Sequence, residues 1–368
     1  MIKVCHFTSA HDSFDTRIFQ KECTWIAKKN EYEVYLVVQG KSRIENGVRI
    51  IGIGEKPNGR LKRMFCFSKK VYQKALELDA DIYHFHDPEL LWFGYKLHKK
   101  GKKVIFDSHE DTVSQIRIKP YIPKLVRRVI AKIYYVYETF ICKRIDGVIY
   151  PASRNENNPF INRCKRTILL DNVPIVEDYK YDKNIEKSID VCCTGSLTEE
   201  RGISVLLKAV RKCGCSIALA GDIDSEYYNQ LIDSGLLYKH EYKGMLNKSE
   251  VINLLSKTRI MVSNILNIGQ YAEMDNLPTK VYEAMSMKMP VILSKLNLFE
   301  KLIDEYKFGI CVDPSNVDEI ADAISYLLSN NEVCVSMGEN GRALVEKTYS
   351  WSHDIEMLYK LYDEIICS

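Results

Sequence analysis

Two short apolar runs separated by an amphipathic segment open the chain, and this order constrains the fold more than any other feature. Residues 1–8 (MIKVCHFT) and 32–38 (YEVYLVV) have the length and composition of buried strands. Residues 17–29 between them have the pattern of a helix. A strand, a helix and a second strand in this order predict a doubly wound, parallel α/β sheet.

The same alternation continues along the chain and restarts once. A polar segment at 177–188 is interpreted as a linker, and strand–helix alternation resumes after it with SIDVCCTGS. A chain of 368 residues is long enough for two domains, each with its own core. We therefore predict a second α/β sheet after the linker. The further strands expected before the linker lie at 47–53, 81–87, 102–111, 146–152 and 167–174.

Composition argues against several classes of function. The net charge of +3 gives no global field that would favour nucleic acid, so no nucleic-acid partner is expected. No apolar run reaches the roughly 18 residues that would suggest a membrane span. Twelve cysteines without a signal peptide favour free thiols in a cytoplasmic protein. No two ligand pairs have the spacing of a zinc site, so no metal site is expected.

Polar and titratable residues gather where the predicted strands of the first domain end. The first turn lacks the G-x-G-x-x-G fingerprint of dinucleotide-binding domains. Because parallel strands bring their carboxyl ends to one edge of a sheet, these residues predict an active site at that edge. The alternative is ordinary loop solvation, with Asp15 capping the following helix. The residues concerned are His11, Asp12, Asp15 and Arg17 after the first strand, His84, His86 and Asp87 at a later one, and Asp107, His109, Glu110 and Asp111 at the next.

Residues 275–290 (DNLPTKVYEAMSMKMP) predict an anion site in the second domain. Pro278 suits the start of a helix, and Lys280 and Glu283 are spaced to share one face of it. A cation close to a helix N-terminus suits a diphosphate, and the carboxylate suits sugar hydroxyls. The alternative is a capped surface helix with a solvated Lys–Glu pair.

Residues 116–144 contain a basic amphipathic helix from Pro123 onward. Such a helix can lie on an anionic membrane surface. The alternative is a helix that faces the core and has a solvated basic side. The apolar face is predicted to contain Leu125, Val129, Ile133, Val136 and Phe140, and the other faces carry Lys124, Arg127, Arg128, Lys132, Lys143 and Arg144.

The chain resembles the family-4 glycosyltransferases over nearly its whole length. The resemblance rests on five segments in order: HFTSAHDSFDTRIFQKE, DIYHFHDPELL, FDSHED, TGSLTEERG and NLPTKVYEAMSMKMPVI. It implies the GT-B fold, with two Rossmann-like, doubly wound domains that face a cleft. The acceptor-side domain would span residues 1–170 and the nucleotide-sugar domain residues 171–349. Residues 350–368 would form a helix that crosses back to the first domain.

The resemblance assigns the donor residues one by one. Glu283 matches the second glutamate of the family's signature, which binds the nucleotide ribose. Asp275 stands where the first glutamate, which contacts the donor sugar, is usual. Arg201 replaces a family lysine and keeps the charge that grips the diphosphate. Ser196 stands where the family has an arginine, and Lys280 can supply the missing charge.

The remaining assignments complete three sets of site residues. His109 matches the histidine that the family places near the donor sugar. The catalytic set is then His109, Arg201, Lys280 and Asp275; the donor-binding set is Gly195, Ser196, Arg201, Gly221, Lys280 and Glu283; and the acceptor-side set is His11, Asp15, Arg17, His86 and Glu110.

The activity implied by the resemblance is a retaining sugar transfer from a nucleotide-sugar. Uridine is the commonest base among similar enzymes, and the acceptor would be a glycan or a polyprenyl-linked sugar in surface-polysaccharide synthesis. Arg201, Lys280 and the helix that starts near Pro278 can stabilise the leaving diphosphate, so we expect metal-independent catalysis without a bound cofactor. The protein would act in the cytoplasm, with possible peripheral contact to the inner membrane face through residues 116–144. A nucleotide-sugar epimerase of the same fold and a non-catalytic partner subunit stay open as alternatives.

Overall fold

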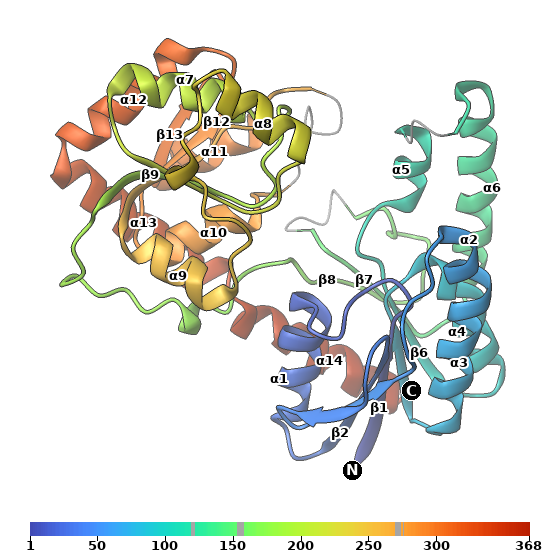
Figure 1. Ribbon diagram of the computed structural model, residues 1–368. Helices are drawn as coiled ribbons and strands as arrows, with labels where there is room; N and C mark the ends of the chain where they lie inside the picture. Colours follow the sequence, from blue (N-terminus) through green and yellow to red (C-terminus); the bar gives the residue numbers. More distant parts are fainter. Residues whose placement is uncertain (119–121, 153–157, 269–273, 275) are drawn as a thin grey trace. The chain divides into compact units, whose positions relative to one another are not determined.

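The computed structural model describes residues 1–118, 122–152, 158–268, 274 and 276–368. They form two compact units, each built around its own sheet (Figure 1). The N-terminal unit comprises Met1–Asn172 and Ser352–Ser368, and the C-terminal unit comprises Val173–Trp351. Both boundaries lie two residues beyond the positions expected from the sequence. All twelve cysteines are free thiols.

The N-terminal unit has an eight-stranded sheet in its described residues, in the order β3-β4-β2-β1-β5-β6-β7-β8. Neighbouring strands are parallel except β3 and β4, which form an antiparallel edge. This order confirms the doubly wound α/β sheet that the opening strand–helix–strand pattern predicts. The strands are β1 (Ile2–Phe7), β2 (Tyr32–Val38), β3 (Arg43–Glu45), β4 (Val48–Gly52), β5 (Ile82–Phe85), β6 (Lys103–Asp107), β7 (Gly147–Tyr150) and β8 (Thr167–Leu169).

Helices cover both faces of this sheet (Figure 1). Helices α3 (Ser68–Glu77) and α4 (Leu91–Lys99) cover the face onto which Cys5 and Phe7 of β1 point, and there they form a hydrophobic core. The opposite face carries His6, which is the register partner of His84 on β5. The C-terminal helix α14 (Trp351–Ile366) lies over that face and places Tyr362 against both rings.

The helix expected at 17–29 has a different form from the one predicted. It begins as a π-helix, η1 (Thr16–Cys23), and continues as α1 (Thr24–Ala27). The Asp15 carboxylate accepts the backbone N–H groups of Arg17 and Ile18, and the Asp15 carbonyl accepts those of Phe19 and Gln20. The bond from Gln20 spans five residues, and such wide turns shift the following side chains relative to a regular α-helix.

The other helical segments of the N-terminal unit lie between these elements. They are α2 (Arg60–Lys62), the π-helix η2 (Arg63–Phe67), the short 3₁₀ turn η3 (Pro88–Leu90), α5 (Thr112–Ile118) and α6 (Lys124–Cys142). Among the described helices of either unit, none combines the length and the apolar character that a membrane span requires.

The C-terminal unit has a five-stranded parallel sheet in the order β10-β9-β11-β12-β13. This sheet confirms the second α/β sheet predicted after the linker. Its strands are β9 (Ile189–Thr194), β10 (Ile217–Ala220), β11 (Thr258–Ser263), β12 (Val291–Ser294) and β13 (Gly309–Val312). The helical segments are η5 (Val176–Asp178), α7 (Ile203–Cys213), α8 (Ser225–Asp233), η6 (Lys239–Glu241), α9 (Lys248–Ser256), α10 (Thr279–Ser286), α11 (Asn297–Tyr306), α12 (Val317–Ser329) and α13 (Asn331–Thr348).

Helix α13 was not among the helices expected from the sequence, and two glycines explain why. Gly338 and Gly341 lower helix propensity, but both are buried where α13 meets the end of α10. A Cβ at Gly338 would lie 2.1 Å from the Lys288 carbonyl oxygen, and one at Gly341 would lie 3.2 Å from Met285 Cγ. The glycines therefore allow a close approach that fixes α10, the helix that carries Lys280 and Glu283.

The Gly338→Ala substitution tests this packing. Helix propensity alone would make the alanine variant more stable by up to about 1 kcal/mol. Because the new methyl group meets a backbone oxygen that has little room to move, we expect a loss of about 1–3 kcal/mol in the free energy of unfolding. Urea denaturation measures the difference, with Ser336→Ala on the exposed side of α13 as the control. A stabilised Gly338→Ala variant would contradict the close approach.

Candidate functional site

The carboxyl ends of β1, β5 and β6 meet at one edge of the N-terminal sheet, and a buried ion pair lies there. Arg17 donates two hydrogen bonds to Asp107, from Nε at 2.8 Å and from Nη2 at 2.9 Å. Its Nη1 donates to the Leu170 carbonyl oxygen at 2.8 Å. Both charged side chains are almost fully buried. The bidentate geometry fixes the position of Asp107 relative to the helix η1 and the end of β8.

Two histidines contact the carboxylate of Asp107. His86 Nδ1 and His109 Nε2 each lie 3.2 Å from Asp107 Oδ2. Burial acts to raise the pKa of Asp107, but the Arg17 and His109 charges outweigh it and hold that pKa well below its usual range. Burial lowers the pKa of His86 to about 4. Asp107 is thus a fixed negative charge, His86 is a neutral ring beneath it, and His109 is the partly exposed member of the group.

His11 and Asp15 form a second pair at this edge. His11 Nδ1 lies 2.9 Å from Asp15 Oδ2, and His11 Nε2 lies 3.6 Å from the buried Asp87. Asp87 itself accepts hydrogen bonds from Thr8 Oγ1 and from the backbone N–H of Ser9. Burial acts to lower the pKa of His11, but the hydrogen bond to Asp15 and the surrounding carboxylates outweigh it and raise that pKa. Asp15 therefore orients His11 and also caps η1, the role given by the alternative interpretation.

A cavity of about 1040 Å³ opens beside these residues within the N-terminal unit. Of the predicted acceptor-side residues, His11, His86 and Glu110 line it, and His109 lines it too. Asp15 and Arg17 do not line this cavity but contact His11 and Asp107 at its edge, and their assignment to the acceptor side stays a prediction. The rest of the wall combines apolar side chains with polar groups of both charge signs, and Arg63 pairs with Glu89 in it. These residues are Ala10, Arg60, Leu61, Arg63, Met64, Phe65, Asp87, Pro88, Glu89, Trp92, Phe93, Thr112, Gln115, Ile116, Ile122, Tyr134 and Tyr137.

Helix α6 exposes the apolar face that the sequence pattern marked. Leu125 is 94% exposed and Ile133 is 64% exposed, and Val129, Val136 and Phe140 are exposed as well. Among the described residues of α6, the buried ones are instead Ala131, Glu138, Ile141 and Cys142, and Glu138 pairs with Arg163. The alternative interpretation is therefore right in part: α6 packs on the core through Ala131, Ile141 and Cys142, but the apolar face marked by the pattern does not contact the core of this unit. Arg128 and Lys132 are also exposed.

The predicted donor residues of the C-terminal unit line a separate pocket of about 510 Å³. A tight turn after β9 forms one wall, and two glycines make it possible. Gly221 has φ +140°, and a Cβ there would lie 1.9 Å from the Gly195 carbonyl oxygen. The lining residues include Thr194, Gly195, Ser196, Arg201, Gly221, Met245, Leu246, Pro278, Thr279, Lys280 and Glu283.

Lys280 is the charge at the base of this pocket. It is 7% exposed, and its Nζ lies 3.5 Å from Cys193 Sγ. Within the described part of the chain, Lys280 forms no ion pair with a carboxylate. Pro278 is the residue that precedes α10, so Lys280 lies in its first turn. The capped surface helix with a solvated Lys–Glu pair is therefore wrong, because Lys280 is buried.

Glu283 is held from one side by Tyr179. The Tyr179 hydroxyl donates to Glu283 Oε1 at 2.8 Å, and burial together with the Glu283 charge raises the pKa of Tyr179. The Tyr179 carbonyl in turn accepts from Arg342 of α13 at 2.8 Å. The sequence carried no signal for Tyr179, since it lies in the segment between two expected strands about a hundred residues from Glu283. Asp275 lies outside the described residues.

The His11–Asp15 pair predicts a pH dependence of stability. A histidine whose pKa is raised in the folded state stabilises the fold below its ordinary pKa near 6.5 and loses this contribution as the pH rises through the raised value. We expect His11→Gln to lower the free energy of unfolding at pH 6 by on the order of 1 kcal/mol more than at pH 8.5. Urea titrations of both proteins at the two pH values measure this difference. An equal effect at both pH values would show that the pair carries no charge coupling.

Comparison with known proteins identifies relatives of each half of the chain. Residues 24–157 match the family model "Glycosyltransferase Family 4", and residues 176–344 match the model "Glycosyl transferases group 1". The alpha-D-kanosaminyltransferase of Streptomyces kanamyceticus is 28% identical over 182 residues, which is 48% of this chain and 45% of the relative. The chain spans about half the length of the curated relatives it matches at this level.

Solved structures share the fold over the whole chain. Sucrose-phosphate synthase from Thermosynechococcus elongatus superposes with a TM-score of 0.75, 15% identity and full coverage of both chains. HepE of Anabaena, solved in complex with UDP, superposes with a TM-score of 0.69, 12% identity, and coverage of 99% of this chain and 100% of its own. Two family models that together span most of the sequence, and the shared architecture, place this chain among the family-4 type glycosyltransferases of the GT-B fold.

Proposed function

We propose that the protein transfers a sugar from a nucleotide-sugar, with a UDP-sugar as the donor, to a glycan or lipid-linked acceptor in surface-polysaccharide synthesis. The observation that carries the proposal is the buried Lys280 at the start of α10, beside the glycine turn of the C-terminal pocket. A buried ammonium group is costly unless an anion compensates it, and a diphosphate at a helix N-terminus does so. Structures of HepE with UDP and with UDP-glucose support this class of donor.

The donor pocket is suited to a leaving diphosphate. Gly195 and Gly221 keep side chains away from one wall, so a phosphate can approach the backbone closely. Arg201 and Lys280 supply positive charge, and Glu283 is placed by Tyr179 to accept hydrogen bonds from ribose hydroxyls. These groups stabilise the charge that develops on the leaving diphosphate, and we propose that this happens without a catalytic metal.

We propose retention of the anomeric configuration by same-face attack. The bond from the anomeric carbon to the diphosphate oxygen breaks, and the acceptor oxygen forms its bond on the same face. The acceptor proton passes to the departing phosphate, so charge and atoms balance. His109 is our candidate for orienting the donor sugar, because Asp107 and His86 fix its ring while its edge reaches the cavity of the N-terminal unit.

The acceptor side is proposed to be the cavity of the N-terminal unit, at the cytoplasmic membrane face. Its lining combines apolar side chains with polar groups of both charge signs, which suits an acceptor that joins sugar hydroxyls to an apolar part. The exposed apolar face of α6, flanked by Arg128 and Lys132, suits contact with anionic lipid.

Substitution of Glu283 tests the donor site. The Glu283→Gln change keeps the shape but removes the charge that accepts ribose hydroxyls, so we expect a higher donor KM, a lower kcat, and a 10- to 100-fold loss in kcat/KM, equivalent to about 1.5–3 kcal/mol. Release of the nucleoside diphosphate measures the kinetics, with the exposed Glu305→Gln on α11 as the control. Unchanged kinetics in Glu283→Gln would remove the assignment.

Product analysis without acceptor separates transfer from the alternative reaction, because an epimerase would interconvert the free donor.

Co-sedimentation with vesicles tests the membrane contact. We expect the wild type to bind vesicles rich in anionic lipid and to dissociate as salt is raised. Ile133→Asp combined with Val136→Asp should abolish binding, because it places charge on the apolar face of α6, while Tyr326→Asp on the C-terminal unit should leave binding intact. Equal recovery with neutral and anionic vesicles, or no binding at all, would contradict this part of the proposal.

A further inference from the structure

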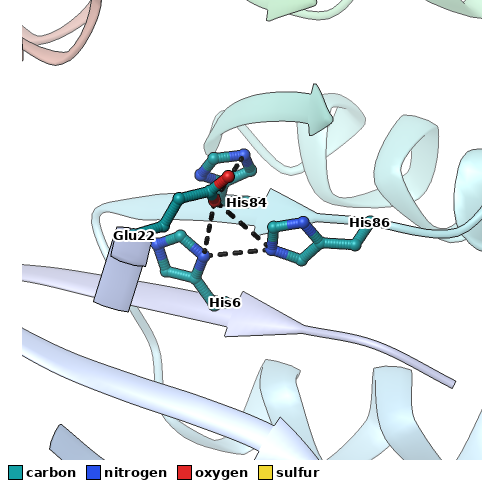
Figure 2. A group of neighbouring side chains, drawn as sticks. All are labelled: His6, Glu22, His84 and His86. Carbon is teal, nitrogen blue, oxygen red and sulfur yellow. Dashed lines mark hydrogen bonds and ion pairs between the residues drawn. The ribbon is translucent and has the colours of Figure 1, made fainter. Parts of the chain in front are cut away.

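Three histidines and a glutamate meet beneath the candidate acceptor cavity, fully enclosed by protein (Figure 2). His6 lies on β1 and His84 on β5, and His86 directly follows β5. Glu22 comes from the π-helix η1, which covers this face of the sheet. Each of the four side chains is at most 1% exposed. The glycosyl-transfer proposal uses none of their inward-facing atoms.

The inward atoms of the four side chains have the spacing of a ligand shell. All lie within 4.8 Å of one another. Glu22 Oε2 is 3.7 Å from His6 Nδ1 and 3.9 Å from both His84 Nε2 and His86 Nε2. Zinc–nitrogen bonds of about 2.0–2.1 Å in a tetrahedron separate ligand atoms by about 3.3 Å. The separations between Glu22 and the three rings exceed this value by only about half an ångström.

The outward nitrogens of the rings are already held as those of metal ligands usually are. His86 Nδ1 lies 3.2 Å from Asp107 Oδ2. His6 Nε2 lies 3.1 Å and His84 Nδ1 2.9 Å from the hydroxyl oxygen of Tyr362, which has two lone pairs and can accept from both rings. Such outer contacts fix the tautomer that turns a lone pair toward a metal.

Hydrogen bonds within the protein do not satisfy all the inward-facing polar atoms of this cluster. His86 can donate to Asp107 and accept from His6 at 3.0 Å, and His6 can accept from Tyr362. His84 then donates to Tyr362, so its Nε2 has no partner. Glu22 Oε2 is also buried without a hydrogen-bond donor, whereas Glu22 Oε1 lies 3.2 Å from Nε of Arg17. A buried carboxylate oxygen without a donor is disfavoured, and Glu22 Oε2 lies within 3.9 Å of the inward nitrogens of all three rings.

We propose that His6, His84, His86 and Glu22 bind one divalent metal ion of the zinc class, through His6 Nδ1, His84 Nε2, His86 Nε2 and a Glu22 oxygen. Imidazole and carboxylate ligands suit zinc, and four protein ligands without an open position are typical of a structural site. The ion satisfies the orphaned atoms and ties η1 to β1 and β5. It also orients His86, whose Nδ1 lies 3.2 Å from both Asp107 Oδ2 and His109 Nε2. The site is separate from the donor pocket and does not depend on the proposed sugar transfer.

Metal analysis of the full chain, purified without a polyhistidine tag or chelator, tests the proposal. We expect close to one bound ion per chain. Protein unfolded with chelator and refolded with Co²⁺ should show the intense visible bands of four-coordinate cobalt, without the near-ultraviolet bands of thiolate ligands. The Tyr362→Phe variant should bind the ion about 10- to 100-fold more weakly, because it loses the acceptor for two ring N–H groups.

Matched variants separate this site from other binding. Glu22→Gln and His84→Gln should lose the ion, whereas His240→Gln and Cys66→Ser, both outside the cluster, should keep it. If the cluster variants do not fold, the wild-type cobalt spectrum decides alone. A wild type that holds no ion after refolding with excess Zn²⁺ and dialysis would overturn the proposal. Metal content in the Glu22 and His84 variants equal to that of the wild type would also overturn it, as would a thiolate band in the cobalt spectrum.

Discussion

The N-terminal site depends on the buried bidentate pair between Arg17 and Asp107. Arg17 belongs to the π-helix η1 and Asp107 ends β6, and the same guanidinium donates to the Leu170 carbonyl just beyond β8. Removing one partner of such a pair leaves an uncompensated buried charge, which typically costs about 3–5 kcal/mol. With Asp107 fixed, His86 and His109 have a common anchor, and His109 reaches the cavity in one orientation. Helix η1 also delivers Glu22 to the histidine cluster, so one local departure from α-helical geometry serves both centres.

The C-terminal unit achieves a comparable fixation by close backbone approach rather than by ion pairing. Gly221 lies directly against Gly195, and Gly338 lies against the Lys288 carbonyl. The first contact shapes the wall of the donor pocket, and the second sets α13 against the end of α10. Tyr179 and Arg342 complete the support of Glu283 through a short chain of hydrogen bonds. Lys280 and Glu283 are therefore held on a fixed helix, as electrostatic stabilisation of a leaving diphosphate requires.

The spacing of apolar residues, and the polar residues that follow the strands, predict most of the fold and part of the site. Buried parallel strands are short apolar runs, so both sheets could be expected from the sequence, as could the gathering of His11, His86 and His109 at one edge. Long-range pairing left no local trace: Tyr179 with Glu283, and Tyr362 with two histidines, are separated by more than a hundred residues. Helix α13 was missed because its glycines serve packing. The exposed face of α6 could not be settled by periodicity, which marks an apolar face but not what covers it.

A thermal-shift comparison with UDP, GDP, ADP and dTDP shows whether the C-terminal pocket binds a nucleoside diphosphate. Binding at a hundred times Kd stabilises the folded protein by about 2.7 kcal/mol, which raises Tm by a few degrees. We expect such a rise with one nucleotide, UDP, measured against a baseline that contains the same EDTA concentration. We also expect the rise to be lost in Lys280→Met. No shift with any of the four nucleotides, or a shift that persists in Lys280→Met, would show that the pocket does not bind a nucleoside diphosphate through Lys280.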